Sequence, residues 1–221
     1  MRILPCRARA AFICALLSSA LLWGCEDPKN HRTSESGKDT SRKFLKGGDL
    51  KFSDDFDRET IGSAYTSTSS LWKIQDGWVH VQGARNEGLW LTEKLPQRAR
   101  IEFDARSESE DGDLKIEVFA TQPKHEGGYV VIFGGWKNQL NVIARLDEHG
   151  SDRKVIPAPK VERGKTYRFA VIKANKTLSW YLDGKLVLSY PDPSPLSGRF
   201  LGFNNWETPV FYDNLKVYAL D

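Results

Sequence analysis

Two tryptophans lie in turn-like stretches of this sequence that are rich in amides. Trp136 is part of Gly134-Gly135-Trp136-Lys137-Asn138, and Trp206 is part of Asn204-Asn205-Trp206-Glu207. An aromatic ring can stack on the apolar face of a sugar while neighbouring amides bond its hydroxyl groups. The alternative is that both rings pack against the rim of the fold. The candidate ligand-binding residues are Trp136, Trp206, Asn138, Asn204, Asn205, Tyr129 and Arg145.

Tyr129 and Arg145 belong to this candidate set because both fall on predicted strands. Together with Asn141 they can share one face of a sheet, and the strand register decides whether they do.

Other ionisable side chains lack the local spacing that marks a metal or catalytic site. The residues considered are His80, His125, His149, Glu117, Glu148 and Glu207. The histidines show no i, i+2 or i, i+4 relation to one another, so they do not indicate zinc. We expect each of them to be exposed or to be satisfied within the fold, and no catalytic residue is assigned.

Short alternating runs that follow Asp49 must position these residues. Ile101, Phe103 and Ala105 alternate with polar residues, and no long stretch has helical periodicity. Asp183-Gly184 between two alternating runs is a strong signal for a two-residue hairpin. Trp180 alternates with apolar neighbours and is expected in the core. About a dozen short strands predict an all-β fold, a two-sheet antiparallel jelly-roll sandwich.

Four motifs carry a resemblance to a known family. They are Phe52-Ser-Asp-Asp-Phe56, Trp72-Lys-Ile-Gln-Asp-Gly-Trp78, Tyr181-Leu-Asp-Gly184 and Phe211-Tyr-Asp-Asn-Leu215. Residues 49–221 resemble the concanavalin A-like lectin and glucanase jelly roll, and within it the LamG-type and 3-keto-disaccharide hydrolase-type modules of exported bacterial proteins. The motifs mark scaffold positions, so the resemblance implies the fold more strongly than an activity.

Laminarinase-type members of that family carry Glu-x-Asp-x-x-Glu on a central strand. Here Glu102 and Asp104 begin the pattern, but Ser107 stands in the third position and the next acid is Glu108. A shift of one residue on a strand moves the side chain to the other face. We therefore expect Glu102 and Asp104 to lie on the solvent face of an amphipathic strand.

The resemblance also implies a structural calcium ion where the two ends of the jelly roll meet. Asp54, Asp55 and Asp213 would supply the carboxylate oxygens that calcium prefers. The alternative is that Asp54 and Asp55 form a turn and Asp213 makes hydrogen bonds. No other cofactor is expected.

The amino terminus reads as a secretory signal. Arg2, Arg7 and Arg9 precede an apolar run that is too short for a membrane-spanning helix. Leu22-Trp23-Gly24-Cys25 resembles the lipobox of bacterial lipoproteins, which implies cleavage after residue 24 and diacylation of Cys25. Two acyl chains give stable membrane anchoring. An ordinary signal peptide, with Cys25 as a bystander, is the alternative.

Charge and cysteine content agree with this division. The three leader arginines account for the whole formal net charge of +3, so the rest of the chain is neutral and offers no basic surface for nucleic acid. All three cysteines lie within residues 1–25, which excludes disulfides and cysteine chemistry from the globular part. Residues 25–48 are polar and predict a flexible tether, so the domain is expected at 49–221.

These features favour a lipid-anchored protein of the bacterial cell envelope, with its domain outside the cytoplasm. Its jelly-roll module is expected to bind a glycan or another envelope component. A glycan-processing hydrolase on the same scaffold is the alternative, and a purely structural adhesion domain is a third. Facing carboxylates in a groove would favour the enzyme, whereas aromatic rings and amides alone would favour the binding module.

Overall fold

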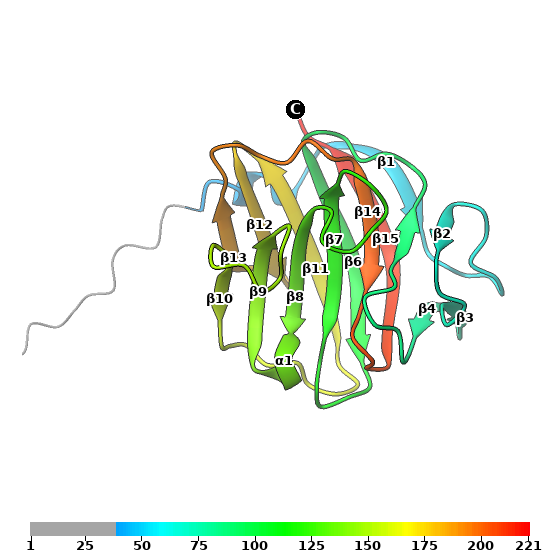
Figure 1. Cartoon of the computed structure of the whole chain (residues 1–221). Helices are drawn as coiled ribbons and strands as arrows, with labels where there is room; N and C mark the ends of the chain where they lie inside the picture. Colours follow the sequence, from blue (N-terminus) through cyan, green and yellow to red (C-terminus); the bar gives the residue numbers. More distant parts are fainter. Residues whose placement is uncertain (1–38) are drawn as a thin grey trace, which may run out of the picture. The chain divides into compact units, whose positions relative to one another are not determined.

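The computed structural model describes residues 39–221, which form two antiparallel β-sheets packed face to face (Figure 1). The eight-stranded sheet has the order β13 (Lys185–Pro191), β12 (Thr177–Leu182), β11 (Thr166–Ala174), β6 (Ala99–Ser107), β15 (Val210–Ala219), β4 (Trp78–Val81) and β3 (Lys73–Gln75), with β1 (Asp49–Asp54) also paired to β15. The seven-stranded sheet has the order β10 (Lys154–Ile156), β9 (Leu140–Arg145), β8 (Tyr129–Gly134), β7 (Leu114–Ala120), β14 (Phe200–Asn204), β5 (Leu89–Leu91) and β2 (Tyr65–Ser67). The short elements η1 (Arg42–Leu45) and α1 (Gly135–Asn138) lie outside the sheets. The predicted all-β, two-sheet jelly-roll fold is confirmed.

Alternation along the strands decides which side chains face the core. On β6 the buried residues Ile101, Phe103 and Ala105 alternate with half-buried polar ones, as the sequence predicts. The predicted hairpin joins β12 to β13, where Asp183 and Gly184 both have positive φ, as a two-residue turn of this kind requires.

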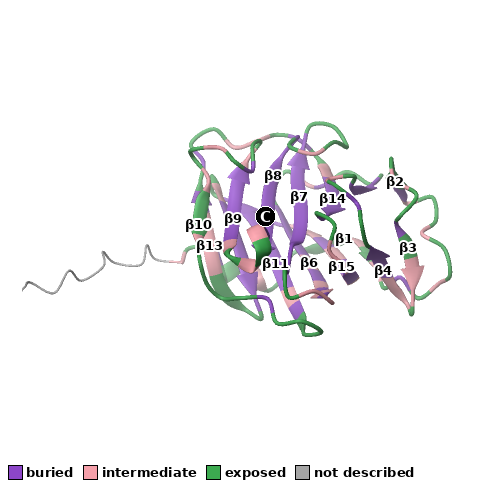
Figure 2. Ribbon diagram, turned by 60° about the horizontal axis from the view of Figure 1, so that its bottom comes forward, coloured by how far each residue is buried: buried purple, intermediate pink, exposed green. Residues whose placement is uncertain are grey.

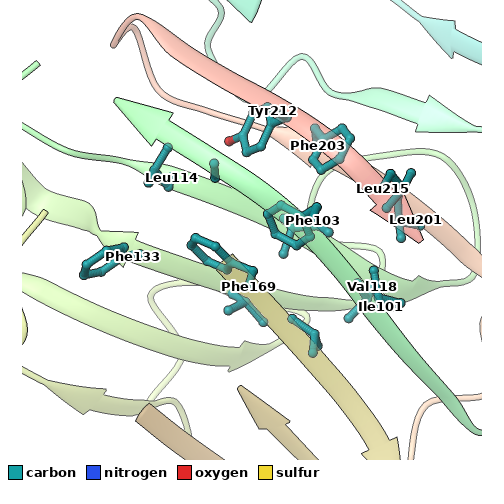
Figure 3. Close-up of a cluster of buried hydrophobic side chains, with 14 of the residues drawn as sticks. Ile101, Phe103, Leu114, Val118, Phe133, Phe169, Leu201, Phe203, Tyr212 and Leu215 are labelled. Carbon is teal, nitrogen blue, oxygen red and sulfur yellow. The ribbon is translucent and has the colours of Figure 1, made fainter. Parts of the chain in front are cut away.

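Aromatic rings fill the space between the sheets (Figure 3). Phe103 of the eight-stranded sheet stacks on Phe169 at 4.7 Å and meets the edge of Phe203, from the opposite sheet, at 5.3 Å. Trp180 is fully buried and stacks on Phe169, so its predicted core position is confirmed. Offset and edge-on pairs of this kind add about 0.5–1.5 kcal/mol each to the burial of their surface.

The seven-stranded sheet is buried on both faces at its centre (Figure 2). Every residue of β7 and β8 is buried, although side chains of opposite parity point away from each other. The inner face belongs to the main core, while Val130, Ile132, Val142 and Ala144 form a smaller cluster on the outer face. Loops must therefore cover the outer face, and the candidate site lies between these loops and the sheet.

The domain begins earlier than the sequence predicts. Residues 39–48 lie on the outer face of the eight-stranded sheet, so the predicted tether boundary at residue 48 is wrong for this part. Phe44 and Leu45 pack on Ala170, Ile172 and Tyr181, among other residues of a small cluster. The Arg100 guanidinium donates to the backbone oxygens of Phe44 and Gly47, both at 2.8 Å. Two apolar side chains, together with these hydrogen bonds, dock an otherwise polar segment.

Within residues 39–221, no helix combines the length and the apolar character that crossing a membrane requires. The predicted signal peptide, residues 1–24, and Cys25 lie outside the described residues.

Candidate functional site

A cleft of about 900 Å³ opens over the outer face of the seven-stranded sheet. Trp136 of α1 and Trp206 of the β14–β15 loop both line it. In Figure 1, α1 and this loop lie at the same end of the sandwich, at the bottom of the view. The remaining lining residues are Asn86, Ser109, Asp111, Asp113, Lys115, His125, Glu126, Ile132, Lys137, Glu148, His149, Glu207, Thr208 and Pro209.

Lys115 is held on the floor of the cleft by two partners. It alternates on β7 with Leu114 and Ile116, which face the core, so its side chain points to the outer face. Its ammonium lies 2.9 Å from Glu148 Oε2 and donates to Asn86 Oδ1 at 2.8 Å. Lys115 and Glu148 are both buried, and the ion pair offsets part of the cost of removing the two charges from water.

A second polar chain runs beside the first and is centred on Glu117. This fully buried carboxylate contacts His125 Nδ1 at 2.5 Å and accepts the Asn204 side-chain amide at 2.7 Å. It also accepts the backbone N–H of Glu126 at 2.9 Å. Glu117 therefore fixes the ring of His125, whose Nε2 lies 3.9 Å from Glu148 Oε1. The two polar chains meet at Glu148.

Tyr212 holds the backbone beneath both chains. Its buried hydroxyl crosses from β15, accepts the N–H of Lys115 at 3.0 Å and donates to the backbone oxygen of Asn204 at 2.8 Å. Burial raises the pKa of this phenol, so it stays protonated and able to donate. A core residue thereby sets the spacing of β7 and β14 at Lys115 and Asn204, whose side chains contribute to the site.

The ring of Trp136 is placed by a strained turn. Trp136, Lys137 and Asn138 all have positive φ, so α1 is a left-handed turn, a conformation that L-residues rarely adopt in sequence. The Asn138 side chain closes this turn by donating to the Val161 oxygen at 2.7 Å and accepting the Val161 N–H at 2.9 Å. Arg153 lies over the Trp136 ring at 4.9 Å. Asn138 thus supports the turn that presents Trp136.

Trp206 lies on the opposite rim and is 48% exposed. Its backbone N–H donates to Asp113 Oδ2, and Arg85, which is paired with Glu207, lies 6.0 Å from its ring. Burial raises the pKa of Asp113, since little water is left to solvate its charge. The loop is therefore anchored through its backbone while the indole ring remains open to solvent.

The amides beside Trp206 are not among the residues that line the cleft. Asn204 and Asn205 are completely buried, and Asn205 donates to the backbone oxygen of Thr208 within the same loop. Asn204 contributes to the floor through Glu117, and Asn205 shapes the loop.

Tyr129 and Arg145 lie away from the cleft. They are paired in register on β8 and β9, and both bond Asp192 Oδ2, at 2.6 and 3.0 Å. Burial opposes ionisation of Asp192, but these bonds outweigh it and keep its pKa below the ordinary value. Asn141 is buried and bonds the backbone of Gly134 and Pro159. The polar groups of these three residues are engaged within the fold.

The predicted calcium ligands have other partners. Asp54 accepts two bonds from the Arg58 guanidinium, at 2.5 and 2.8 Å, and one from Tyr65. Asp55 accepts the N–H of Asp57, and Asp213 accepts that of Asn214, as the turn alternative predicts. Among residues 39–221, no group of three or more His, Cys, Asp or Glu side chains is arranged to hold a metal ion. The donor set around Asp54 therefore fits a calcium ion poorly, because Arg58 already neutralises it.

Glu102 and Asp104 lie on the outer face of the eight-stranded sheet, in the opposite layer from the cleft. Arg168 bonds both of them, at 3.2 and 3.1 Å. They form an amphipathic strand surface, as expected, and they are not part of the site.

Sequence reasoning missed the floor of the cleft. Glu117, His125, Glu148 and His149 appear isolated along the chain, yet Glu148 Oε1 lies within 4 Å of the imidazoles of both His125 and His149. One signal was present: the alternation of Lys115 and Glu117 with apolar residues on β7 puts two charges on one face of a strand.

Solved structures with this fold include several proteins named for carbohydrates. A carbohydrate-binding module, CBM66, from Bacillus subtilis matches with a TM-score of 0.59 at 16% identity, over 73% of this chain and 98% of that chain. A laminarinase from Flavobacterium sp. UMI-01 matches with a TM-score of 0.60 at 12% identity, over 77% of this chain and 100% of that chain. A Bacillus subtilis protein with a galectin-like fold matches with a TM-score of 0.56 at 12% identity, over 79% of this chain and 97% of that chain.

No protein-family model matches the sequence, and no curated protein sequence matches it. At such low identities the structural likeness shows the fold alone. The chain has the concanavalin A-like, galectin-like jelly roll that a carbohydrate-binding module and a laminarinase also have.

Proposed function

We propose that this chain is a lipid-anchored envelope protein whose jelly-roll domain binds a glycan in the cleft between Trp136 and Trp206. One observation carries the proposal: two tryptophan rings line a cleft whose floor is made of fixed hydrogen-bonding side chains. Its volume of about 900 Å³ falls within the range of roughly 300–1,000 Å³ that is common for ligand sites.

The two rings are suited to stacking on sugars. Arg153 lies over the ring of Trp136 and Arg85 near that of Trp206, so each indole is steadied by a guanidinium. Trp136 and Trp206 both line the cleft. A sugar that stacks there would bring its hydroxyl groups toward Lys115 and Glu148.

A glycan array followed by titration tests this proposal. The protein for the assay begins at Asp39, because residues 39–221 contain both sheets and the apolar clusters packed on them. We expect saturable binding to at least one glycan and a loss of about tenfold in affinity in Trp206→Ala, which corresponds to roughly 1.4 kcal/mol. No binding to any glycan, or equal affinity in this variant, would contradict the proposal.

A glycan-processing hydrolase is the second candidate, and a specific observation favours it. The cleft holds carboxylates as well as aromatic rings, and Glu148 faces His125, which Glu117 orients. A positioned acid or base of this kind is what proton transfer to a reacting group requires. Glycosidases use a pair of carboxyl groups that flank the scissile bond.

Release of reducing sugar from the glycans that bind distinguishes the two candidates. Hydrolysis by the wild-type protein that is lost in Glu148→Gln, even when the glycan is supplied at a concentration that saturates the variant, would establish the enzyme. Binding without release of reducing ends supports the binding module.

The anchor in this proposal rests on the sequence. Leu22-Trp23-Gly24-Cys25 supports lipid attachment at Cys25, and the polar residues that follow would link the lipid to the domain.

A further inference from the structure

We infer that the cleft takes a neutral glycan, bound at its floor by the Lys115–Glu148 pair, and disfavours glycans that carry carboxylate, sulfate or ammonium groups. This inference rests on the proposed function and names the class of ligand.

The cations near the cleft already have partners. Lys115 is paired with Glu148 at 2.9 Å, Arg85 is paired with Glu207, and His125 contacts Glu117 at 2.5 Å. Arg153 donates to the backbone oxygen of Glu148 at 2.7 Å and lies over Trp136. Lys137 is exposed at the rim. To pair with a buried cation, an anionic sugar would have to displace the carboxylate that is already paired with it.

Carboxylates outnumber lysines in the lining. Five acids, Asp111, Asp113, Glu126, Glu148 and Glu207, line the cleft with two lysines, Lys115 and Lys137. A cleft lined mainly by one sign of charge repels ligands of that sign. Polyanionic glycans are therefore disfavoured both by repulsion and by the lack of a deep cation to receive them.

A cationic sugar does not fit the floor either. Glu148 is neutralised by Lys115, and Glu126 Oε1 accepts the backbone N–H of Glu148 at 3.0 Å. An ammonium group placed against this floor would meet the charge of Lys115. The ion pair itself carries no net charge, whereas the exposed acids Asp111, Glu126 and Glu207 lie elsewhere in the lining.

The same pair is suited to adjacent hydroxyl groups. A lysine ammonium has three N–H donors; that of Lys115 donates one to Asn86 Oδ1 and lies 2.9 Å from Glu148 Oε2 as an ion pair. Glu148 Oε1 is 3.9 and 3.8 Å from the nitrogens of His125 and His149, which is beyond hydrogen-bond distance. One donor and one acceptor thus lie side by side. One sugar hydroxyl can accept from Lys115 while its neighbour donates to Glu148.

Matched glycan pairs test the inference on the protein that begins at Asp39. The probes are oligogalacturonate and its methyl ester, chitosan hexamer and its N-acetylated form, and a neutral panel of laminarin, cellohexaose, mannohexaose and levan. We expect binding only among the neutral members. Their affinity should change less than twofold between 50 and 500 mM NaCl, because salt weakens attraction between charges and a neutral glycan carries none.

Two variants complete the experiment. Glu148→Gln keeps the shape of the side chain but removes the carboxylate that is paired with Lys115, so neutral binding should fall at least tenfold and anionic binding should rise. Glu102→Gln is the matched control, because Glu102 is also paired with cations but lies in the other layer. It should leave binding unchanged.

The outcomes separate this inference from the proposed function. Tightest binding to an anionic or cationic probe, or a tenfold loss of affinity with salt, overturns the inference and leaves glycan binding in place. Failure of every probe and of the wider array overturns both.

Discussion

Trp136, Trp206 and Trp180 differ in what surrounds their rings, so truncating each should have different effects. Trp180 is fully buried, and Trp180→Ala should cost about 3–5 kcal/mol of stability. Trp206 is 48% exposed, so Trp206→Ala should cost less than about 1 kcal/mol. Trp136 is half-buried against the outer cluster, so its cost should be intermediate. Urea unfolding of the three variants measures these values.

Glycan titration of the same variants should give the reverse order for loss of affinity, with Trp180→Ala affected least. Affinity should fall in Trp136→Ala and Trp206→Ala, because each loses a stacking surface in the cleft. If both variants unfold as readily as Trp180→Ala, the two rings belong to the core and the glycan site loses its aromatic support.

Lys173 should make the free energy of unfolding rise with pH in the alkaline range. Its ammonium is buried over the Phe119 ring at 3.9 Å and donates to the Leu196 oxygen at 2.5 Å. Burial lowers its pKa to about 8, although Asp192 opposes the shift. In the unfolded chain the pKa is about 10.4, so between these values the unfolded state binds more protons. The free energy of unfolding should therefore rise by on the order of 1 kcal/mol from pH 7.5 to 9.5.

Lys173→Met should remove that rise, and unfolding of both proteins at several pH values measures the difference. The range stops at pH 9.5 because tyrosines act in the opposite direction above it. Burial and Asp152, for example, raise the pKa of Tyr190 to about 12, and stability from such groups is lost as the unfolded phenols ionise near pH 10. Parallel pH curves for the two proteins would show that Lys173 is not the source.

At the scale of elements, the segment 39–48 should stabilise the domain. A chain that begins at Asp49 loses the cover of Phe44 and Leu45 over Ile172 and Tyr181. It also leaves Arg100, which is buried, without two of its backbone acceptors. We expect such a chain to fold cooperatively but to be less stable than one that begins at Asp39, by about 2 kcal/mol for the lost apolar burial.

Urea midpoints of the two chains measure this difference, and Phe44→Ala in the longer chain is the matched control. It should reproduce part of the loss without changing the chain's length. Equal midpoints for all three proteins would show that the docked segment contributes nothing.

The strands themselves could be predicted because their signals are local. Alternation on β6 and the Asp183-Gly184 turn between β12 and β13 each depend on a few neighbouring residues. The docking of segment 39–48 could not be predicted, because it depends on which apolar side chains the folded eight-stranded sheet presents on its outer face. One phenylalanine and one leucine in a polar stretch have no periodicity.

The floor of the site depends on contacts between distant residues. Glu117 and Asn204 are 87 residues apart in the chain but share a hydrogen bond. Charged residues alternate on both β6 and β7, so the pattern alone does not tell which strand faces solvent and which lies beneath loops. Glu102 and Asp104 were therefore as prominent in the sequence as Lys115 and Glu117. Sheet order and loop cover make the distinction.

Across the whole molecule, the cleft and the start of the domain lie on opposite layers. The chain reaches the outer face of the eight-stranded sheet at Asp39, where Asp39 Oδ1 accepts a hydrogen bond from Tyr181 at 2.6 Å. The cleft opens over the outer face of the seven-stranded sheet.

The proposed lipid anchor leads to a prediction for the full-length chain. Cys25→Ser removes the thiol to which the proposed lipid is attached, so labelling with a fatty-acid analogue should be lost completely. The protein should then move from the membrane fraction to the soluble envelope fraction, because two acyl chains hold a protein stably at a membrane and the loss of both leaves nothing equivalent. The wild-type chain, washed with high salt, is the control, since salt removes proteins held only by charge. If the variant still sediments with membranes after that wash, the lipid is not the anchor, and the glycan site would have to be sought on a protein attached in another way.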